Sequence, residues 1–549
     1  MRNSILTRVT GLILGRTSTS YSRCSGVSRP FGRLVEQRVQ SALLRKQLKH
    51  FGRLARLALL WSKGRPELAF GRSERSANPV MRPTGKRRVM VTGSRRVRST
   101  ARAGRLVVAT WRRAQRWQMR SSLTLCLVLV SPGIFAQDLP TAPASQLGLA
   151  QERLDRIVGL VEEAVERGEV AGAVTLVARF GRVGHLEAVG WRDTSQGAPM
   201  EAGTLFRIAS MTKAVTSVAV MQLYESGALL LSDPVSLYLP EFSDMQVLVP
   251  AGPGQDGAGY RLEPASRPIT IRHLLTHTSG LSYRFLAPLH LASYYLEADI
   301  SDGLSQTDGT VGDMVSRLAE LPLLHQPGEN FTYSLGVDVL GRVVEVVTGL
   351  NLADYMATKI FEPLGMVDTA FYRGRDEAER YASVYTPTNG GIGRVSDSPV
   401  VSPDRRTIYS AGYPYGELQN YYSGGAGLSS TISDYARFLL ALLNGGERDG
   451  VRILGARTVQ LMTTDHLVGL GALDTGQRFG LGFAISDDPG LTGGPRSEGS
   501  FGWLGFFNTV YWVDPQEQLV AIIMTQLYPN SQSRLTDRFE VAVYSAIIN

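Results

Sequence analysis

Residues Ile208 to Lys213 read IASMTK and lie at the start of a long apolar run. The run has helical periodicity and ends at Gly227, a residue suited to the left-handed position that follows a helix. Ser210 is therefore expected at a helix N-terminus, where backbone N–H groups and the helix dipole favour negative charge. The apolar face consists of Ala214, Val215, Val218, Ala219 and Leu223.

Ser210 and Lys213 are one helical turn apart and share a face. A serine hydroxyl is a weak nucleophile that needs a neighbouring base, and a lysine is such a base only when burial or another cation lowers its pKa. The S-x-x-K pattern alone also occurs by chance. From residue 121 onward, however, the chain has only two lysines, Lys213 and Lys359, against 27 arginines. Arginine does not deprotonate, so a lysine retained here favours a base.

The charge of the chain is divided between two regions of opposite sign. Residues 1–120 carry 29 Lys and Arg and three acids, whereas residues 121–549 carry 29 basic and 46 acidic residues. The overall charge of +9 is therefore not typical of the larger part. An acidic body argues against a nucleic-acid partner, and we expect none.

Residues 119–136 have the pattern of a secretory signal peptide, with a positive start, the apolar run LTLCLVLV and an exit near Ala136. The run is too short for a bilayer span, so we expect an exported, periplasmic or secreted protein without stable membrane insertion. The Arg-rich extension 1–118 could be a disordered transit peptide, a nucleic-acid-binding arm or the product of a misplaced start codon. We favour the misplaced start. Residues 137–149 are expected to be a linker.

Residues 150–549 should form one α/β protein of the α+β type, with an antiparallel sheet built from both chain ends. Helices should flank this sheet, and a mostly helical domain should be inserted between its halves. Both cysteines, Cys24 and Cys126, lie outside this body, so it has no disulfide. The end segments are a helix over 150–168, a hairpin of AGAVTLVARFG and HLEAVGW, a hairpin of FNTVYWVDP and QLVAIIMTQ, and a helix over 533–548.

Tyr333 lies in a second segment with a possible role in proton transfer. The sequence HQPGENFTYSLGVDVLGRVVEVVTGL predicts a Pro-Gly loop and then a helix that ends at Gly349. Ser334 is the expected N-cap, which places the Tyr333 ring on the loop before the helix. Such a tyrosine is often a packing residue, but its phenol could also relay a proton to and from Ser210.

These motifs together resemble the serine β-lactamase-like superfamily of class C β-lactamases, D-Ala-D-Ala carboxypeptidases and family VIII carboxylesterases. The resemblance covers about 150–549 and implies an acyl-enzyme on Ser210, with Lys213 and Tyr333 as acid and base and with no cofactor or metal. The remaining matching segments are HTSGL at 277–281, FEPLGM at 361–366 and YSGGAGL at 422–428.

Two departures from the β-lactamase pattern favour an esterase. Leu335 occupies the third position of the tyrosine motif, where β-lactamases have Asn, and no K-T-G occurs. Trp503-Leu504-Gly505 lies in the K-T-G place, which is similar to family VIII esterases. The resemblance implies that Trp503, Gly505 and Leu335 shape the substrate site and that the N–H groups of Ser210 and Phe506 form an oxyanion hole. Without an ammonium to pair a carboxylate, the site should prefer neutral, partly apolar esters.

The sequence therefore predicts a serine hydrolase that cleaves small carboxylic esters. One alternative is a β-lactamase or a D-Ala-D-Ala carboxypeptidase or transpeptidase on the same fold, and another is a non-catalytic penicillin-binding-like sensor. The G-x-S-x-G elbow of α/β-hydrolases is absent. His273 and His277 have metal-ligand spacing, but structural packing is favoured because the Glu of H-E-x-x-H is missing. The oligomeric state is left open.

Overall fold

The computed structural model describes residues 138–251, 259–470, 476–530 and 533–548. The predictions for the Arg-rich extension 1–118 and for the signal peptide 119–136 lie outside these residues. Within the described residues, no helix is both long enough and apolar enough to cross a bilayer.

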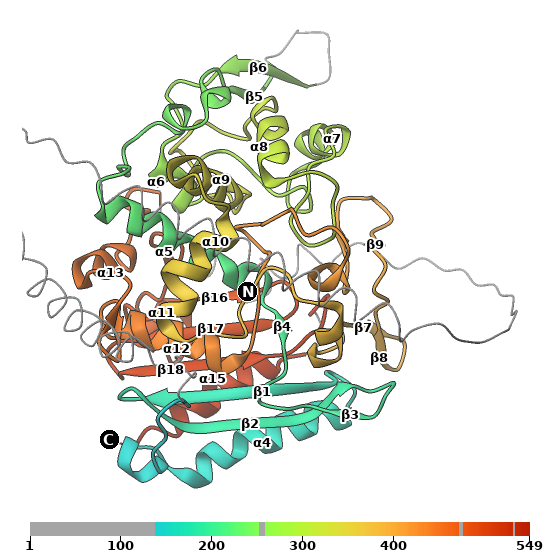
Figure 1. Ribbon diagram of the computed structural model, residues 1–549, viewed down its shortest axis with the longest axis vertical. Helices are drawn as coiled ribbons and strands as arrows, with labels where there is room; N and C mark the ends of the chain where they lie inside the picture. Colours follow the sequence, from blue (N-terminus) through green and yellow to red (C-terminus); the bar gives the residue numbers. More distant parts are fainter. Residues whose placement is uncertain (1–137, 252–258, 471–475, 531–532, 549) are drawn as a thin grey trace, which may run out of the picture. The chain divides into compact units, whose positions relative to one another are not determined.

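The centre of the fold is an eight-stranded sheet whose neighbouring strands are all antiparallel (Figure 1). Strands from the two chain ends meet at the pairing of β1 with β18, where Leu176 lies opposite Ile522. This confirms the predicted sheet. In spatial order the strands are β14 (Arg478–Phe479), β15 (Ala484–Ile485), β16 (Phe501–Gly505), β17 (Thr509–Asp514), β18 (Leu519–Met524), β1 (Gly172–Arg179), β2 (Arg182–Asp193) and β3 (Ala198–Pro199).

Helices cover both faces of the sheet. On one face, α4 (Gln151–Glu166) packs beside α15 (Leu535–Ser545), and their apolar sides share a core with Trp512 of β17. On the other face lie α5 (Thr212–Glu225) and α12 (Ile432–Leu443), as Figure 1 shows. Both end helices are slightly shorter than the predicted spans of 150–168 and 533–548.

The segment predicted as a linker is part of the domain. Leu147 and Leu149 are buried in the core between α4 and the sheet. The Val183 N–H donates to the Pro140 carbonyl, and the Ala142 N–H donates to the Val183 carbonyl, so the chain is tied to β2. A linker was therefore the wrong interpretation for residues 138–149.

The chain between the two halves of the sheet is mostly helical, as predicted. These helices share one continuous apolar core with α5 and the inner face of the sheet. They are α6 (Ile271–Leu275), α7 (Leu289–Glu297), α8 (Val311–Ala319), α9 (Gly336–Thr348), α10 (Leu352–Met356) and α11 (Glu362–Leu364), followed later by α13 (Ala456–Met462). The short α14 (Pro489–Thr492) lies between β15 and β16 and has no buried residue. Two-stranded pairs interrupt them: β4 (Phe206–Arg207) with β11 (Ser429–Ser430), β5 (Gln246–Pro250) with β6 (Tyr260–Pro264), β7 (Tyr385–Thr388) with β8 (Gly391–Arg394), β9 (Val400–Val401) with β10 (Ile408–Tyr409), and β12 (Glu447–Arg448) with β13 (Val451–Arg452).

The helix that follows Ser210 is more buried than its periodicity suggested. Ser210 lies in a 3-10 turn (Ala209–Met211) that leads directly into α5. The polar residues Lys213, Thr216 and Ser217 are buried together with the apolar ones. Since α5 lies between the sheet and the helical region, it has almost no solvent-facing side.

The sequence predicted Ser334 as the N-cap of α9, but the N-cap is Leu335. The Ser334 hydroxyl still accepts a 3.2 Å hydrogen bond from the Gly336 N–H, so the residue caps the helix from one position earlier. Its contact with His277 explains the shift, because the Ser334 N–H points to the His277 Nδ1 at 3.3 Å.

Candidate active site

Lys213 is placed to act on Ser210. Its Nζ lies 3.2 Å from the Ser210 Oγ and donates a 2.7 Å hydrogen bond to the Gly425 carbonyl. Only 2% of Lys213 is exposed, and this burial lowers the pKa of its ammonium to about 7, although the charges of Asp338 and Asp302 oppose the change. With this pKa, a large fraction of the amine is uncharged at pH 7, as a base requires.

Tyr333 completes a three-residue cluster with Ser210 and Lys213. The Lys213 Nζ lies 4.7 Å from the centre of the Tyr333 ring. The phenol accepts a 3.1 Å hydrogen bond from the Trp503 Nε1. Burial raises the pKa of the phenol, while Ser210 and Trp503 act in the opposite direction. The structure thus brings together the three predicted residues, although they are distant in sequence.

The His277 ring packs against the Tyr333 ring. The two ring centroids are 4.7 Å apart, and the His277 Nδ1 is 3.3 Å from the Ser334 hydroxyl. Complete burial, together with the Lys213 charge, holds the pKa of His277 well below its usual value, so the ring is neutral. His273 instead caps α6 by accepting from the Thr270 N–H. Both histidines therefore have packing or capping roles, as expected, and no group of metal ligands occurs among the described residues.

The third predicted motif lies on strand β16, beside the serine turn. A Cβ atom on Gly505 would lie 2.5 Å from the Ile208 carbonyl oxygen. Glycine is therefore required because two backbones approach closely here. The sequence had suggested that Gly505 shapes the substrate site. Phe506 follows directly, and its ring stacks on Tyr528 at a centroid distance of 3.7 Å.

Leu335 does not line the site, contrary to the prediction. It is 0% exposed and belongs to the main core. The chain turns into α9 immediately after Tyr333, so the third position of this motif points into the protein. The apolar residue at this position contributes packing and not substrate contact.

Sequence reasoning missed two residues that contact or surround Lys213. The Tyr283 ring lies 5.0 Å from the Lys213 Nζ, on another side from Tyr333. Asp338 is completely buried on α9, one helical turn after Tyr333. An acid inside a run of valines and leucines was a signal for Asp338, because such a side chain is rarely buried without a partner. The role of Tyr283 had no comparable signal.

The backbone is strained immediately before Ser210 and at His277. Ala209 has φ +42° and His277 has φ +55°, in the left-handed region that residues with a Cβ rarely adopt. Such strain concentrates at functional sites, where the surrounding packing maintains it. Ala209 is fully buried, so its conformation is fixed immediately before Ser210.

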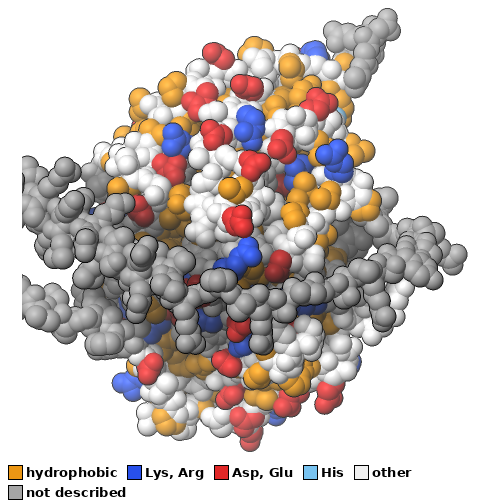
Figure 2. All heavy atoms as spheres, turned by 45° about the vertical axis from the view of Figure 1, so that its right-hand side comes forward, with side chains coloured by type: hydrophobic (Ala, Val, Ile, Leu, Met, Phe, Trp, Pro, Cys, Tyr) orange, Lys and Arg blue, Asp and Glu red, His pale blue; other side chains and the backbone are white. Residues whose placement is uncertain are grey.

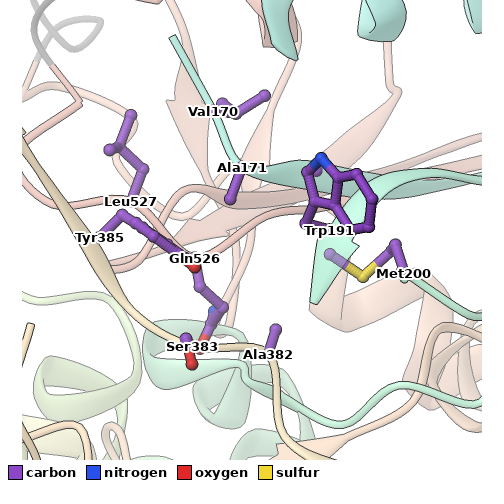
Figure 3. Close-up of a pocket in the computed structure, with 10 residues that line it drawn as sticks. Val170, Ala171, Trp191, Met200, Ala382, Ser383, Tyr385, Gln526 and Leu527 are labelled. Atoms are coloured by element: carbon purple, nitrogen blue, oxygen red, sulfur yellow. The ribbon is translucent and has the colours of Figure 1, made fainter. Parts of the chain in front are cut away.

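A hollow elsewhere on the fold has no connection with these residues. Figure 3 shows it between the start of β1, Trp191 and the segment around Tyr385. Its polar groups are already engaged, because the Tyr385 hydroxyl accepts from the Thr194 N–H and the Gln526 amide donates to the Arg207 carbonyl. We assign no chemistry to this hollow.

Comparison with known proteins defines the class. The chain is 34% identical to Esterase EstB of Burkholderia gladioli over 414 residues, which are 74% of this chain and 98% of that protein. The solved structure of EstCE1, a hydrolase with promiscuous acyltransferase activity, superposes with a TM-score of 0.61 at 30% identity and covers 72% of this chain and 99% of that one. The protein is therefore a serine hydrolase of the carboxylesterase type.

The Beta-lactamase family model matches residues 157–546. The chain belongs to this family, within the serine β-lactamase-like superfamily and near the family VIII esterases. Acyltransferases are also among its relatives. Monacolin J acid methylbutanoyltransferase of Aspergillus terreus is 31% identical over 422 residues, which are 70% of this chain and 94% of that protein.

Proposed function

We propose that the protein cleaves neutral carboxylic esters through an acyl-enzyme on Ser210. The Ser210 Oγ attacks the carbonyl carbon while its proton passes to the Lys213 and Tyr333 pair. The backbone N–H groups of Ser210 and Phe506 hold the oxyanion. The bond to the alcohol oxygen then breaks, and the pair returns the proton to that oxygen. Water attacks the acyl-enzyme in the same way, releasing the carboxylic acid and restoring the serine.

One observation carries this proposal: the Lys213 Nζ lies 3.2 Å from the Ser210 Oγ, and burial gives the lysine a pKa of about 7. A neutral amine at hydrogen-bonding distance can take the serine proton, which is the step that a serine hydroxyl needs most. The Tyr333 phenol is a second group that could exchange this proton, and the hydrogen bond that it accepts from the Trp503 N–H favours its phenolate form.

The surroundings of Ser210 support apolar substrates. Two aromatic clusters contain residues of the proposed site, one around Tyr333 and one around Phe506, and most of their rings are half-buried. On the Tyr333 side the rings are Trp503, Phe331 and Phe479. On the other side they are Phe285, Phe506 and Tyr528. Trp503 takes the place of a cation that would pair a substrate carboxylate, so a neutral ester binds without an unpaired charge.

Acyl transfer to an alcohol is a second candidate function. It differs from hydrolysis only in the nucleophile that attacks the acyl-enzyme. EstCE1 is a hydrolase with promiscuous acyltransferase activity, and further relatives are named as acyltransferases. An apolar site that holds little water favours an alcohol over water at this step.

A substrate panel tests the proposal. The full-length protein should hydrolyse p-nitrophenyl butyrate and should leave nitrocefin and a D-Ala-D-Ala peptide almost unchanged, while Ser210→Ala should be inactive. Added butanol should divert part of the acyl group to butyl butyrate if transfer also occurs. Faster turnover of nitrocefin than of the ester would favour the β-lactamase alternative. Inactivity towards all substrates would favour the sensor.

The cellular setting is also a proposal. We propose that the protein is exported by residues 119–136 and acts on a small-molecule ester without a nucleic-acid partner. On the face drawn in Figure 2, acidic and basic side chains of the described residues lie intermixed, in keeping with a site for neutral substrates. N-terminal sequencing of the protein recovered from the periplasm or medium tests the export, and a cytoplasmic protein that begins at Met1 would contradict it.

A further inference from the structure

The side of Lys213 away from solvent faces a buried polar cluster that the mechanism above does not use. Two carboxylates belong to this cluster: Asp338 on α9 is 0% exposed, and Asp302 in the loop after α7 is 2% exposed. Asp302 is paired with Arg284, whose backbone N–H donates to it at 3.0 Å. Among the described residues, Asp338 forms no ion pair with an arginine or lysine. The cation that acts on its charge from a greater distance is Lys213.

Asp338 holds the turn to which Lys213 is tied. Its Oδ1 accepts a 2.6 Å hydrogen bond from the Ser423 hydroxyl and a 3.2 Å bond from the Gly425 N–H. The carbonyl of the same Gly425 accepts the 2.7 Å bond from the Lys213 Nζ. One carboxylate oxygen therefore holds the N–H of the same residue whose carbonyl anchors the amine.

The glycines of this turn are required by the same contact. A Cβ on Gly425 would collide with the Asp338 Oδ2 and would lie 2.9 Å from the Tyr283 hydroxyl. A Cβ on Gly424 would lie 2.7 Å from the Val337 carbonyl. The turn can thus approach α9 only without side chains, which gives a physical reason for the S-G-G sequence.

We propose that Asp338 is a positioning residue, which holds the Lys213 amine against Ser210 through the Ser423–Gly425 turn and through its own charge. The proposal rests on the proposed base role of Lys213. Asp338 itself is completely buried against the Ser423–Gly425 turn, so it acts through Lys213 and not on the substrate.

The charge of Asp338 acts on Lys213 in a known direction. Burial raises the pKa of the carboxyl and lowers the pKa of the amine, whereas the charge of each group acts in the opposite direction and favours the charged form of the other. A carboxylate beside a lysine favours its protonated form. The groups that face Lys213 from the surrounding elements are Ser210, His277, Tyr283, Asp302 with its partner Arg284, Tyr333 and Asp338.

Replacement of Asp338 by Asn separates charge from position. The Asn Oδ1 retains the bonds from Ser423 and Gly425, so the turn stays in place while the charge is lost. The Lys213 titration should therefore move to lower pH by about 1 unit or more. Lysine-selective 13C labelling and NMR measure it, with the signal assigned by Lys213→Arg.

Asp434→Asn is the matched control. Asp434 is also a buried acid on a helix, and burial raises its pKa to about 6, but it is hydrogen-bonded to Thr369 and paired with Arg437 away from Lys213. This variant should leave the Lys213 titration unchanged. Equal titration midpoints in the wild type and Asp338→Asn would overturn the proposal.

Ser423→Ala tests the positional part and replaces the first test if Asp338→Asn does not fold. It removes the 2.6 Å bond to Asp338 and leaves every charge in place. The rate of Ser210 labelling by a fluorophosphonate should fall about tenfold, and a wild-type rate would contradict the proposed hold on Lys213. If the wild-type protein itself were not labelled, the proposed function would fail, whereas the NMR titration would still decide the role of Asp338.

Discussion

The indole N–H of Trp503 donates a 3.1 Å hydrogen bond to the phenol oxygen of Tyr333. The strand residue that stands in place of a β-lactamase lysine is therefore joined to the proposed proton-transfer cluster. Because this bond favours the phenolate form of Tyr333, Trp503 should affect the chemical step as well as the choice of substrate.

Trp503→Phe should lower kcat by up to about tenfold, because it keeps an aromatic ring but removes one hydrogen bond of ordinary strength. KM for an apolar ester should change little. Steady-state kinetics on p-nitrophenyl butyrate measure both constants. If KM rose and kcat stayed constant, Trp503 would act only as a binding surface.

Trp503→Lys should shift preference towards substrates that carry a carboxylate. The new ammonium would offer a charge-assisted contact at the place where the family's K-T-G cation is expected. The ratio of kcat/KM for an ester with a free carboxylate to that for its neutral analogue measures this preference. An unchanged ratio would mean that Trp503 does not face the substrate.

Tyr333→Phe should lower kcat by about 10²- to 10⁴-fold, the range for loss of a positioned acid or base. The ring contacts with His277 and Trp503 are retained in this variant, so the melting temperature should stay near that of the wild type. Activity within a few-fold of the wild type would assign Tyr333 to packing.

Lys213→Arg should abolish turnover while leaving the fold intact, because a guanidinium does not release its proton. The matched control is Lys359→Arg, since Lys359 is exposed in the turn between α10 and α11. Circular dichroism checks the fold and ester hydrolysis checks the activity. More than a few per cent residual turnover in Lys213→Arg would exclude a base role.

The pH dependence of both activity and stability should follow Lys213. Its pKa is about 7 in the folded protein against 10.5 ordinarily, so kcat/KM should rise as pH increases through about 7. Between these two values the unfolded chain binds more protons than the folded one, and the free energy of unfolding should increase with pH. The difference in stability between the wild type and Lys213→Met isolates this contribution. A difference that is constant from pH 7 to pH 10 would mean that the buried amine is not perturbed.

Gly505→Ala should remove most activity. A Cβ at this position would lie 2.5 Å from the Ile208 carbonyl oxygen, so either strand β16 or the turn before Ser210 must move. A displacement of this kind disturbs the serine and the Phe506 N–H together. The rate of fluorophosphonate labelling reports on the serine, and a wild-type rate would show that the approach of the two backbones is not needed.

The sheet and the Ser210, Lys213 and Tyr333 cluster could be predicted because local signals specify them. The strands alternate or are continuously apolar, and only a few residue types support serine nucleophilic chemistry. Leu335 was assigned wrongly because its position in a motif does not show whether its side chain faces the site or the core. Asp338 and Gly425 were missed because their relation to Lys213 depends on contacts between segments 85 or more residues apart.

The most direct test of the account is rapid-quench mass spectrometry of the full-length protein during turnover of p-nitrophenyl butyrate. We predict a mass increase of one butyryl group, located on the peptide that contains Ser210 and absent in Ser210→Ala. Ester turnover without any acyl adduct, or an adduct on another residue, would contradict the proposal that Ser210 forms the acyl-enzyme.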